Sequence, residues 1–173
     1  NTTGEWGYTA LYWACYNGRL EIVKLLVKKG ADIHEAADSG WRTPLYFACL
    51  HGRLEIAKLL IAKGADINKA ANLGGATPLH WACGDGHMEI VKLLIEEGAD
   101  INKADNDGET PLYWACHNGH MEIVKLLVKK GADIHKATNG GTTPLYWACR
   151  NGHLEVVKLL IEEGADINKA DTD

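Results

Sequence analysis

The chain has 173 residues, of which 46% are hydrophobic and 24% charged, with a formal net charge of −5 and a pI near 5.9. An acidic chain without a basic run is a poor ligand for nucleic-acid phosphates, which need a positively charged face. No stretch approaches the roughly 18–20 apolar residues that a membrane-spanning helix needs. We therefore expect neither nucleic-acid binding nor membrane insertion.

One motif recurs five times along the chain. It starts at Thr9, Thr43, Thr77, Thr110 and Thr143, so the successive offsets are 34, 34, 33 and 33 residues. A fixed period of this length indicates a repeat protein, whose units each bury their apolar faces by stacking on their neighbours. We predict one continuous all-α repeat solenoid over residues 1–173.

The boundaries of the predicted units follow from the period. We place them at approximately 4–37, 38–70, 71–103, 104–136 and 137–169, with 170–173 as the start of a truncated sixth unit. The first unit lacks the proline that follows Thr in the other four, and the second and third each carry one extra turn residue.

The fourth unit illustrates the predicted local structure. Thr110 suits the N-cap of a helix, and Pro111 suits its first position. Gly119 is expected to end that helix, and a second helix is expected over 120–130. The Ala-Asp-Ile-His segment at 132–135 is expected to run extended into a polar turn.

Residue spacing assigns faces to these helices. Leu112, Ala115 and Cys116 form one stripe at i, i+3 and i+4. Two of the three are small, which indicates close packing against another element. The second helix is apolar over well over half its circumference, so it must be covered on two sides. Stacking on the preceding and following units provides that cover.

The repeated pattern is Gly-x-Thr-Pro-Leu-x-x-Ala-x-x-x-Gly-His-x-Glu-Ile-Val-Lys-Leu-Leu-x-x-x-Gly-Ala-Asp-Ile-Asn. It resembles the ankyrin repeat and covers essentially the whole chain. The resemblance implies helix-turn-helix pairs with projecting β-turn fingers, in a curved stack whose concave surface binds another protein. One departure is that the family's histidine after Thr-Pro-Leu occurs as His80, whereas tyrosine stands there in the other four units.

Each unit has a cysteine six residues after its threonine: Cys15, Cys49, Cys83, Cys116 and Cys149. Stacked helices lie about 8–10 Å apart, whereas a disulfide needs Cα atoms within about 7 Å. Equivalent cysteines should therefore not pair. We interpret them as small buried residues of a protein in the reducing cytoplasm.

A Cys-x-x-x-His spacing recurs as Cys83/His87, Cys116/His120 and Cys149/His153. One interpretation is a metal ladder or a Cys–His nucleophile pair. The other is a core cysteine beside a histidine of the repeat motif, and we favour it because the intervening glycine breaks the helix. No phosphate loop, carboxylate pair or serine motif is present. We predict a non-enzyme without a metal or cofactor.

Asn68, Asn102 and Asn168 each follow Ala-Asp-Ile, with a leucine eight residues earlier. This pattern resembles the ankyrin site that the oxygen-sensing asparaginyl hydroxylase modifies. The alternative is a structural asparagine that bonds the backbone of the turn.

Because the chain contains five copies of one unit, its variable positions are visible without an alignment. They cluster at the fingers and first-helix tips, and the apolar ones lie in units one to three. Trp, Tyr and Arg often carry interface energy. We predict a partner footprint centred on Trp6, Tyr8, Tyr16, Trp41 and Arg42, extended by Leu50 and Leu73. The alternative is that these aromatic residues once packed on preceding repeats.

A second candidate surface is an aromatic ladder formed by Trp13, Phe47, Trp81, Trp114 and Trp147. Exposed, these rings would form the floor of a binding groove about 40–50 Å long. Alternatively, each ring packs against the next unit and contributes stability.

Two functions therefore compete: a protein-binding module, and a structural scaffold or artificial, designed array without a dedicated partner. Near-identical units and end units that resemble internal ones favour the second, or a fragment of a longer array. An accessory array tethered to a catalytic domain stays open. End units without polar caps also predict end-to-end self-association.

Overall fold

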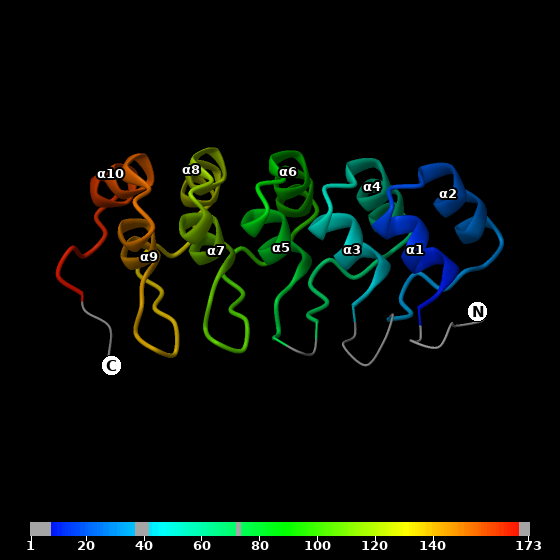
Figure 1. Ribbon diagram of the computed structural model, residues 1–173, viewed down its shortest axis with the longest axis horizontal. Helices are drawn as coiled ribbons and strands as arrows, with labels where there is room; N and C mark the ends of the chain where they lie inside the picture. Colours follow the sequence, from blue (N-terminus) through cyan, green and yellow to red (C-terminus); the bar gives the residue numbers. More distant parts are fainter. Residues whose placement is uncertain (1–7, 37–41, 72–73, 170–173) are drawn as a thin grey trace.

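A computed structural model describes residues 8–36, 42–71 and 74–169, and this part of the chain forms ten helices and no strands. The helices form five antiparallel pairs that stand side by side in chain order (Figure 1). Their bounds are α1 Ala10–Tyr16, α2 Leu20–Lys28, α3 Pro44–Leu50, α4 Leu54–Ala62, α5 Pro78–Gly84, α6 Met88–Glu96, α7 Pro111–Asn118, α8 Met121–Lys129, α9 Pro144–Arg150 and α10 Leu154–Glu162. The predicted all-α repeat solenoid is confirmed.

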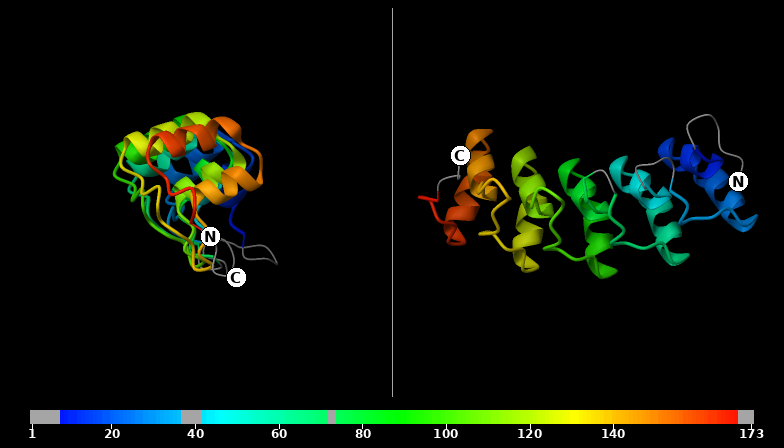
Figure 2. Two further views of the ribbon diagram at one scale, coloured as in Figure 1. Left: turned by 90° about the vertical axis from the view of Figure 1, so that its left-hand side faces the viewer. Right: turned by 90° about the horizontal axis from the view of Figure 1, so that it is seen from below.

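The stack has two helical layers. Odd-numbered helices form the inner layer and even-numbered helices the outer layer, and the connecting loops project beyond the inner layer as fingers (Figure 1). Seen along the long axis, the helices superimpose and the loops extend to one side, which gives an L-shaped profile (Figure 2). None of the described helices is long and apolar enough to cross a bilayer.

The helix starts agree with the sequence prediction. The Thr110 hydroxyl accepts a hydrogen bond from the Tyr113 backbone N–H at 3.2 Å, and Pro111 occupies the first turn. The Ala-Asp-Ile-His segment differs from the prediction: it forms a turn, in which an Asp133 carboxylate oxygen accepts from the His135 N–H at 2.9 Å. The extended conformation was wrong because the short Asp side chain bonds its own backbone two residues on.

The core runs through the whole stack as one continuous cluster. Leu112, Ala115 and Cys116 are fully buried, as the stripe predicts. Neighbouring inner helices contact each other more extensively than neighbouring outer helices do. Small inner-layer side chains allow this closer approach, which bends the stack toward the inner layer.

The cysteines are free thiols, and four of the five are buried. Burial raises the pKa of Cys15 to about 12, so this thiol stays protonated at neutral pH. Cys149 is exposed, which corrects the prediction for this residue. Its counterparts are covered by the following unit, whereas no described unit follows α9 and α10.

Histidines link each unit to the one before. The Nε2 atoms of His87, His120 and His153 lie 3.1, 2.8 and 3.0 Å from backbone carbonyl oxygens at the tips of α3, α5 and α7. Gly86 makes room for one of these rings: its φ is +78°, and a Cβ there would lie 2.7 Å from Cε1 of His120.

These contacts explain the Cys-x-x-x-His spacing. Cys83 and Cys116 are buried in the core, whereas His87 and His120 reach back to the preceding unit. Within residues 8–36, 42–71 and 74–169, no three His, Cys, Asp or Glu side chains gather as a metal site would require.

Asparagine side chains link units in the other direction. The Asn68 side-chain oxygen accepts from the Asp100 N–H at 3.0 Å. The Asn102 amide accepts from the Asp133 N–H at 2.8 Å and donates to the Gly131 carbonyl at 3.1 Å. These asparagines are therefore structural, and they bond the backbone of the next unit.

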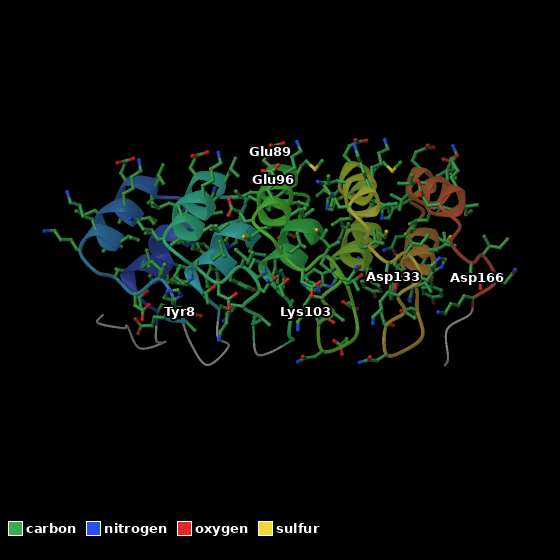
Figure 3. All side chains as sticks on the ribbon, turned by 180° about the vertical axis from the view of Figure 1, so that it is seen from behind. Tyr8, Glu89, Glu96, Lys103, Asp133 and Asp166 are labelled. Atoms are coloured by element: carbon green, nitrogen blue, oxygen red, sulfur yellow. The ribbon has the colours of Figure 1, made fainter. Side chains whose placement is uncertain are left out.

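The outer helices present a charged face. Each carries a Glu–Lys ion pair three residues apart, such as Glu89–Lys92 at 2.7 Å. Figure 3 shows Glu89 and Glu96 on the side of α6 that faces away from the fingers. Exposed pairs of this kind contribute only about 0–1 kcal/mol each.

The asparagine links predict an asymmetric mutational effect. Asn102→Ala should lower the free energy of unfolding by about 1–2 kcal/mol, because it removes two bonds between units. Asn168→Ala is the matched control, since within the described chain this side chain has no following unit to bond. Chemical denaturation measures both, and equal losses would contradict the role given to Asn102.

Candidate functional site

The aromatic ladder lies on the inner helices, but its members differ in exposure. Trp13 is 50% exposed, whereas Phe47 is 3% exposed. Trp81, Trp114 and Trp147 are half-buried. The packed alternative therefore holds for Phe47, and the other four rings offer part of their surface to solvent.

Edge-to-face contacts hold the ladder in place. Phe47 meets Tyr12 of the preceding unit at 4.4 Å between ring centroids with an interplanar angle of 86°. Trp81 and Trp114 meet directly, at 4.8 Å and 80°. Perpendicular aromatic pairs are a favoured geometry. The rings thus contribute stability while they form the surface.

Two hollows open on this surface on either side of Trp114. One, of about 370 Å³, lies toward α9 and is lined by Glu109, Tyr113, Trp114, His117, Asn118 and Trp147. The other, of about 350 Å³, lies toward α3 and α5, and its walls include Trp81, Trp114 and Glu109. Glu109 and Trp114 line both hollows, which makes the two sites neighbours.

Polar atoms in these walls have unused hydrogen-bonding capacity. The indole nitrogen of Trp81 is buried and has no hydrogen-bond partner among the described residues, whereas that of Trp114 is buried beside the Glu109 carboxyl. Trp147 differs, because its indole N–H donates to the Thr142 hydroxyl at 3.2 Å. Burial raises the pKa of the Glu109 carboxyl and the neighbouring Asp105 and Asp107 raise it further, while hydrogen bonds with the Tyr113 and Trp114 side chains act in the opposite direction.

Gly84 shapes the middle of the surface. A Cβ at this position would lie 2.8 Å from Cε3 of Trp114. The other units carry Tyr16, Leu50, His117 and Arg150 at this place. The sequence showed that this position varies, but gave Gly84 no role. Four units have a larger residue at this position and one has glycine, and this difference could have predicted that a ring of a neighbouring unit packs against Gly84.

His80 fixes the finger that carries Glu109. Its Nδ1 accepts from the Thr77 backbone N–H at 3.0 Å, so the ring proton sits on Nε2, which donates to the Glu109 carbonyl at 3.1 Å. The ring is fully buried, and burial lowers its pKa. Neutral His80 therefore ties the third unit to the fourth finger.

The predicted N-terminal footprint is described in part, because Trp6, Trp41 and Leu73 lie outside the described residues. Tyr8 stacks on Tyr12 at 4.3 Å. Tyr16 is 38% exposed and lies 4.4 Å from the His51 ring. The remaining members are Arg42, whose guanidinium lies 5.8 Å from the Phe47 centroid, and the half-buried Leu50. These residues surround α1 and α3, and Arg42 also lines the 350 Å³ hollow at Trp114.

A family model described as ankyrin repeats (3 copies) matches residues 1–71 and 79–171, and a second, ankyrin repeats (many copies), matches 51–95. The chain belongs to the ankyrin repeat family. The resemblance that the sequence motif indicated is thus confirmed, and ankyrin repeats generally mediate protein–protein interaction.

Individual relatives match one part of the ankyrin array. Human protein phosphatase 1 regulatory subunit 27 is 57% identical over 35 residues, which cover 20% of this chain and 23% of that protein. The human Notch-regulated ankyrin repeat-containing protein is 54% identical over 41 residues, which cover 24% and 36%. The zebrafish form A (Danio rerio) is also 54% identical over 41 residues, covering 24% and 37%. The matched segments thus span between about a quarter and two fifths of these relatives.

The buried imidazole predicts a pH dependence of stability. Unfolded His80 gains a proton as pH falls below 6.5, while folded His80 resists protonation because burial lowers its pKa. The unfolded state then binds more protons, so stability should fall below pH 6.5 by at most about 1.4 kcal/mol per pH unit.

His80→Tyr, which installs the residue of the other four units, should flatten this part of the pH profile. Urea unfolding of both proteins from pH 7 to pH 5 measures the difference. The His51 pKa is also lowered, chiefly by burial, but His51 is common to both proteins. Parallel profiles would contradict the role assigned to His80.

Proposed function

We propose that this ankyrin array is a non-catalytic interaction module that binds a protein partner along its inner helices and fingers. The observation that carries the proposal is the contrast between its two faces. The inner face combines exposed aromatic rings, two hollows and the buried indole N–H of Trp81, which has no partner among the described residues. The outer face carries Glu–Lys ion pairs. Aromatic residues in desolvated pockets are typical anchors of protein interfaces.

The contact set proposed from the sequence divides into two parts. The N-terminal part comprises Trp6, Tyr8, Trp13, Tyr16, Trp41, Arg42, Leu50 and Leu73, and the central part comprises Trp81, Trp114 and Trp147. Phe47 supports the first part from below, because it is buried under the rings of Tyr12 and Tyr16. The five free thiols support a reducing, cytoplasmic environment.

The N-terminal part is tested by partner capture. Trp13→Ala with Tyr16→Ala should abolish retention of a protein that the parent chain retains, because both side chains are more than one third exposed. Glu55→Ala with Lys58→Ala, which removes an outer-face ion pair, is the matched control and should retain the partner. Circular dichroism checks that all three proteins fold.

Different outcomes separate the competing functions. If the parent and both variants retain the partner protein, the N-terminal footprint is wrong and the proposed binding function stands. Failure of the parent to retain any protein would favour the scaffold or designed array, in which the aromatic residues serve stacking alone.

We also propose that copies of the chain associate end to end. At one end Ile22 and Leu25 are 50% and 56% exposed, and at the other Leu154 and Ile167 are 60% and 68% exposed. Ile56, the counterpart of Ile22 inside the stack, is 2% exposed. Sedimentation should show concentration-dependent association that Leu25→Glu abolishes. A parent chain that stays monomeric at every concentration contradicts this proposal.

Hydroxylation of Asn68, Asn102 and Asn168 remains a proposal. All three side chains are exposed, but those of Asn68 and Asn102 are engaged by the next unit. Asn168 should therefore be hydroxylated before Asn68 and Asn102 when the chain is incubated with the asparaginyl hydroxylase. Mass spectrometry of the peptides at successive times tests this order.

A further inference from the structure

The hollow lined by Trp81 and Trp114 has aromatic walls that pack on one another. The two indole rings stand at 80° with centroids 4.8 Å apart, and both line the 350 Å³ space. Tyr46 meets Trp81 edge-on at 5.3 Å and lines the same space. These rings contact one another, so a group that enters the hollow meets the outer surface of the aromatic cluster.

The charge around this hollow is mainly negative. Asp105, Asp107 and Glu109, all from the fourth finger, line it together with Arg42. Three carboxylates against one guanidinium leave an excess of two negative charges. A positively charged group entering the hollow would meet these carboxylates and offset the repulsion that Asp105 and Asp107 add to the effect of burial in raising the pKa of Glu109.

The chain fills comparable positions with its own cations. The Arg150 guanidinium carbon lies 4.7 Å from the Trp147 centroid, and that of Arg42 lies 5.8 Å from the Phe47 centroid. Among the described residues, no cation is placed over Trp81 or Trp114. Trp81 and Trp114 thus lie in the ladder between Phe47 and Trp147, which each have a cation from this chain beside them. Trp81 and Trp114 can instead bind a cation from another molecule.

The unpartnered indole N–H of Trp81 indicates the rest of the ligand. A buried donor without an acceptor costs free energy, and an incoming carbonyl oxygen would remove that cost. An extended peptide supplies carbonyl oxygens at regular intervals along its backbone. A basic side chain on such a peptide would bring both the cation and the carbonyl.

We infer that the 350 Å³ hollow lined by Trp81 and Trp114 binds an arginine or lysine side chain of an extended segment of the partner protein, and that a backbone carbonyl of this segment accepts from the Trp81 indole N–H. The inference rests on the proposed binding function and names the chemistry of its ligand. The acidic finger supplies selectivity against neutral and acidic segments.

The 370 Å³ hollow on the other side of Trp114 predicts the spacing of basic residues along the ligand. Inner helices are packed about 8–10 Å apart. An extended segment in the polyproline II conformation advances about 3.1 Å per residue and has three residues per turn, so side chains three residues apart lie on the same side. Such side chains, about 9 Å apart, reach the hollows on either side of Trp114. Glu109 lines both hollows, so a second basic residue at this spacing is also accommodated.

The test uses the whole chain and a fluorescein-labelled peptide, Gly-Ser-Arg-Ala-Ser-Arg-Ser-Gly, at physiological salt. Two control peptides replace both arginines by glutamine or place them next to each other. Fluorescence polarisation should show tightest binding for the first peptide. Asp107→Asn with Glu109→Gln should weaken that binding by about five- to ten-fold.

The matched control is Glu96→Gln with Glu97→Gln, which removes the same two charges at the exposed end of the outer helix α6. This variant should change affinity by less than about two-fold, since its charges lie beyond effective range in salt. Equal weakening by both double variants would overturn the inference, and so would equal binding of the glutamine peptide.

A second readout follows the indole groups directly. In proton–nitrogen correlation spectra, the Trp81 and Trp114 indole signals should shift on adding the arginine peptide, while Trp13 should not. Signals are assigned by Trp→Phe variants. Unchanged Trp81 and Trp114 signals at saturation would overturn the proposed geometry.

Selection from a display library of random peptides separates this inference from the proposed function. Enriched basic peptides with arginine or lysine three residues apart would support both. Enriched peptides that lack basic residues yet need Trp114 would overturn the inference and keep the binding function. A library without any enriched peptide would overturn both.

Discussion

The structure depends on one constraint: no unit can bury the apolar surface of its own helices. Ile123, Val124 and Leu127 of α8 are at most 2% exposed because two neighbouring units cover them. In the first described unit Ile22, the equivalent of Ile123, is 50% exposed, and at the two ends of the stack Leu25 and Leu154 are also more than half exposed. Stability is therefore a property of the interfaces between units, as expected for a linear array.

The same interfaces generate the binding surface. Small residues on the inner helices allow close packing, which aligns the first helices and brings their aromatic side chains into edge contact. Polar links then fix the units in both directions: histidines reach back to the preceding helix tip, and asparagines reach forward to the next turn. His80 adds a link to the fourth finger, which carries the carboxylates of the central hollow.

Periodicity and motif residues were sufficient to predict the fold, because each helix boundary is encoded locally by Thr-Pro and glycine. The turn at 132–135 was missed since its Asp–backbone bond leaves no periodic signal. The site was harder to predict. Spacing placed Trp114 on the inner face, but its partial burial depends on Gly84 and Trp81 of another unit. Phe47 had the same spacing, yet it is buried, because exposure depends on neighbouring rings rather than on position in the repeat.

Native-state hydrogen exchange of the whole chain tests most directly the claim that interfaces between units hold the fold together. The account predicts that amide protection is highest in α5–α8, which have neighbours on both sides, and decreases toward α1–α2 and α9–α10. Equal protection of all five helix pairs, or rapid exchange in α5–α6 while both neighbours stay protected, would contradict it.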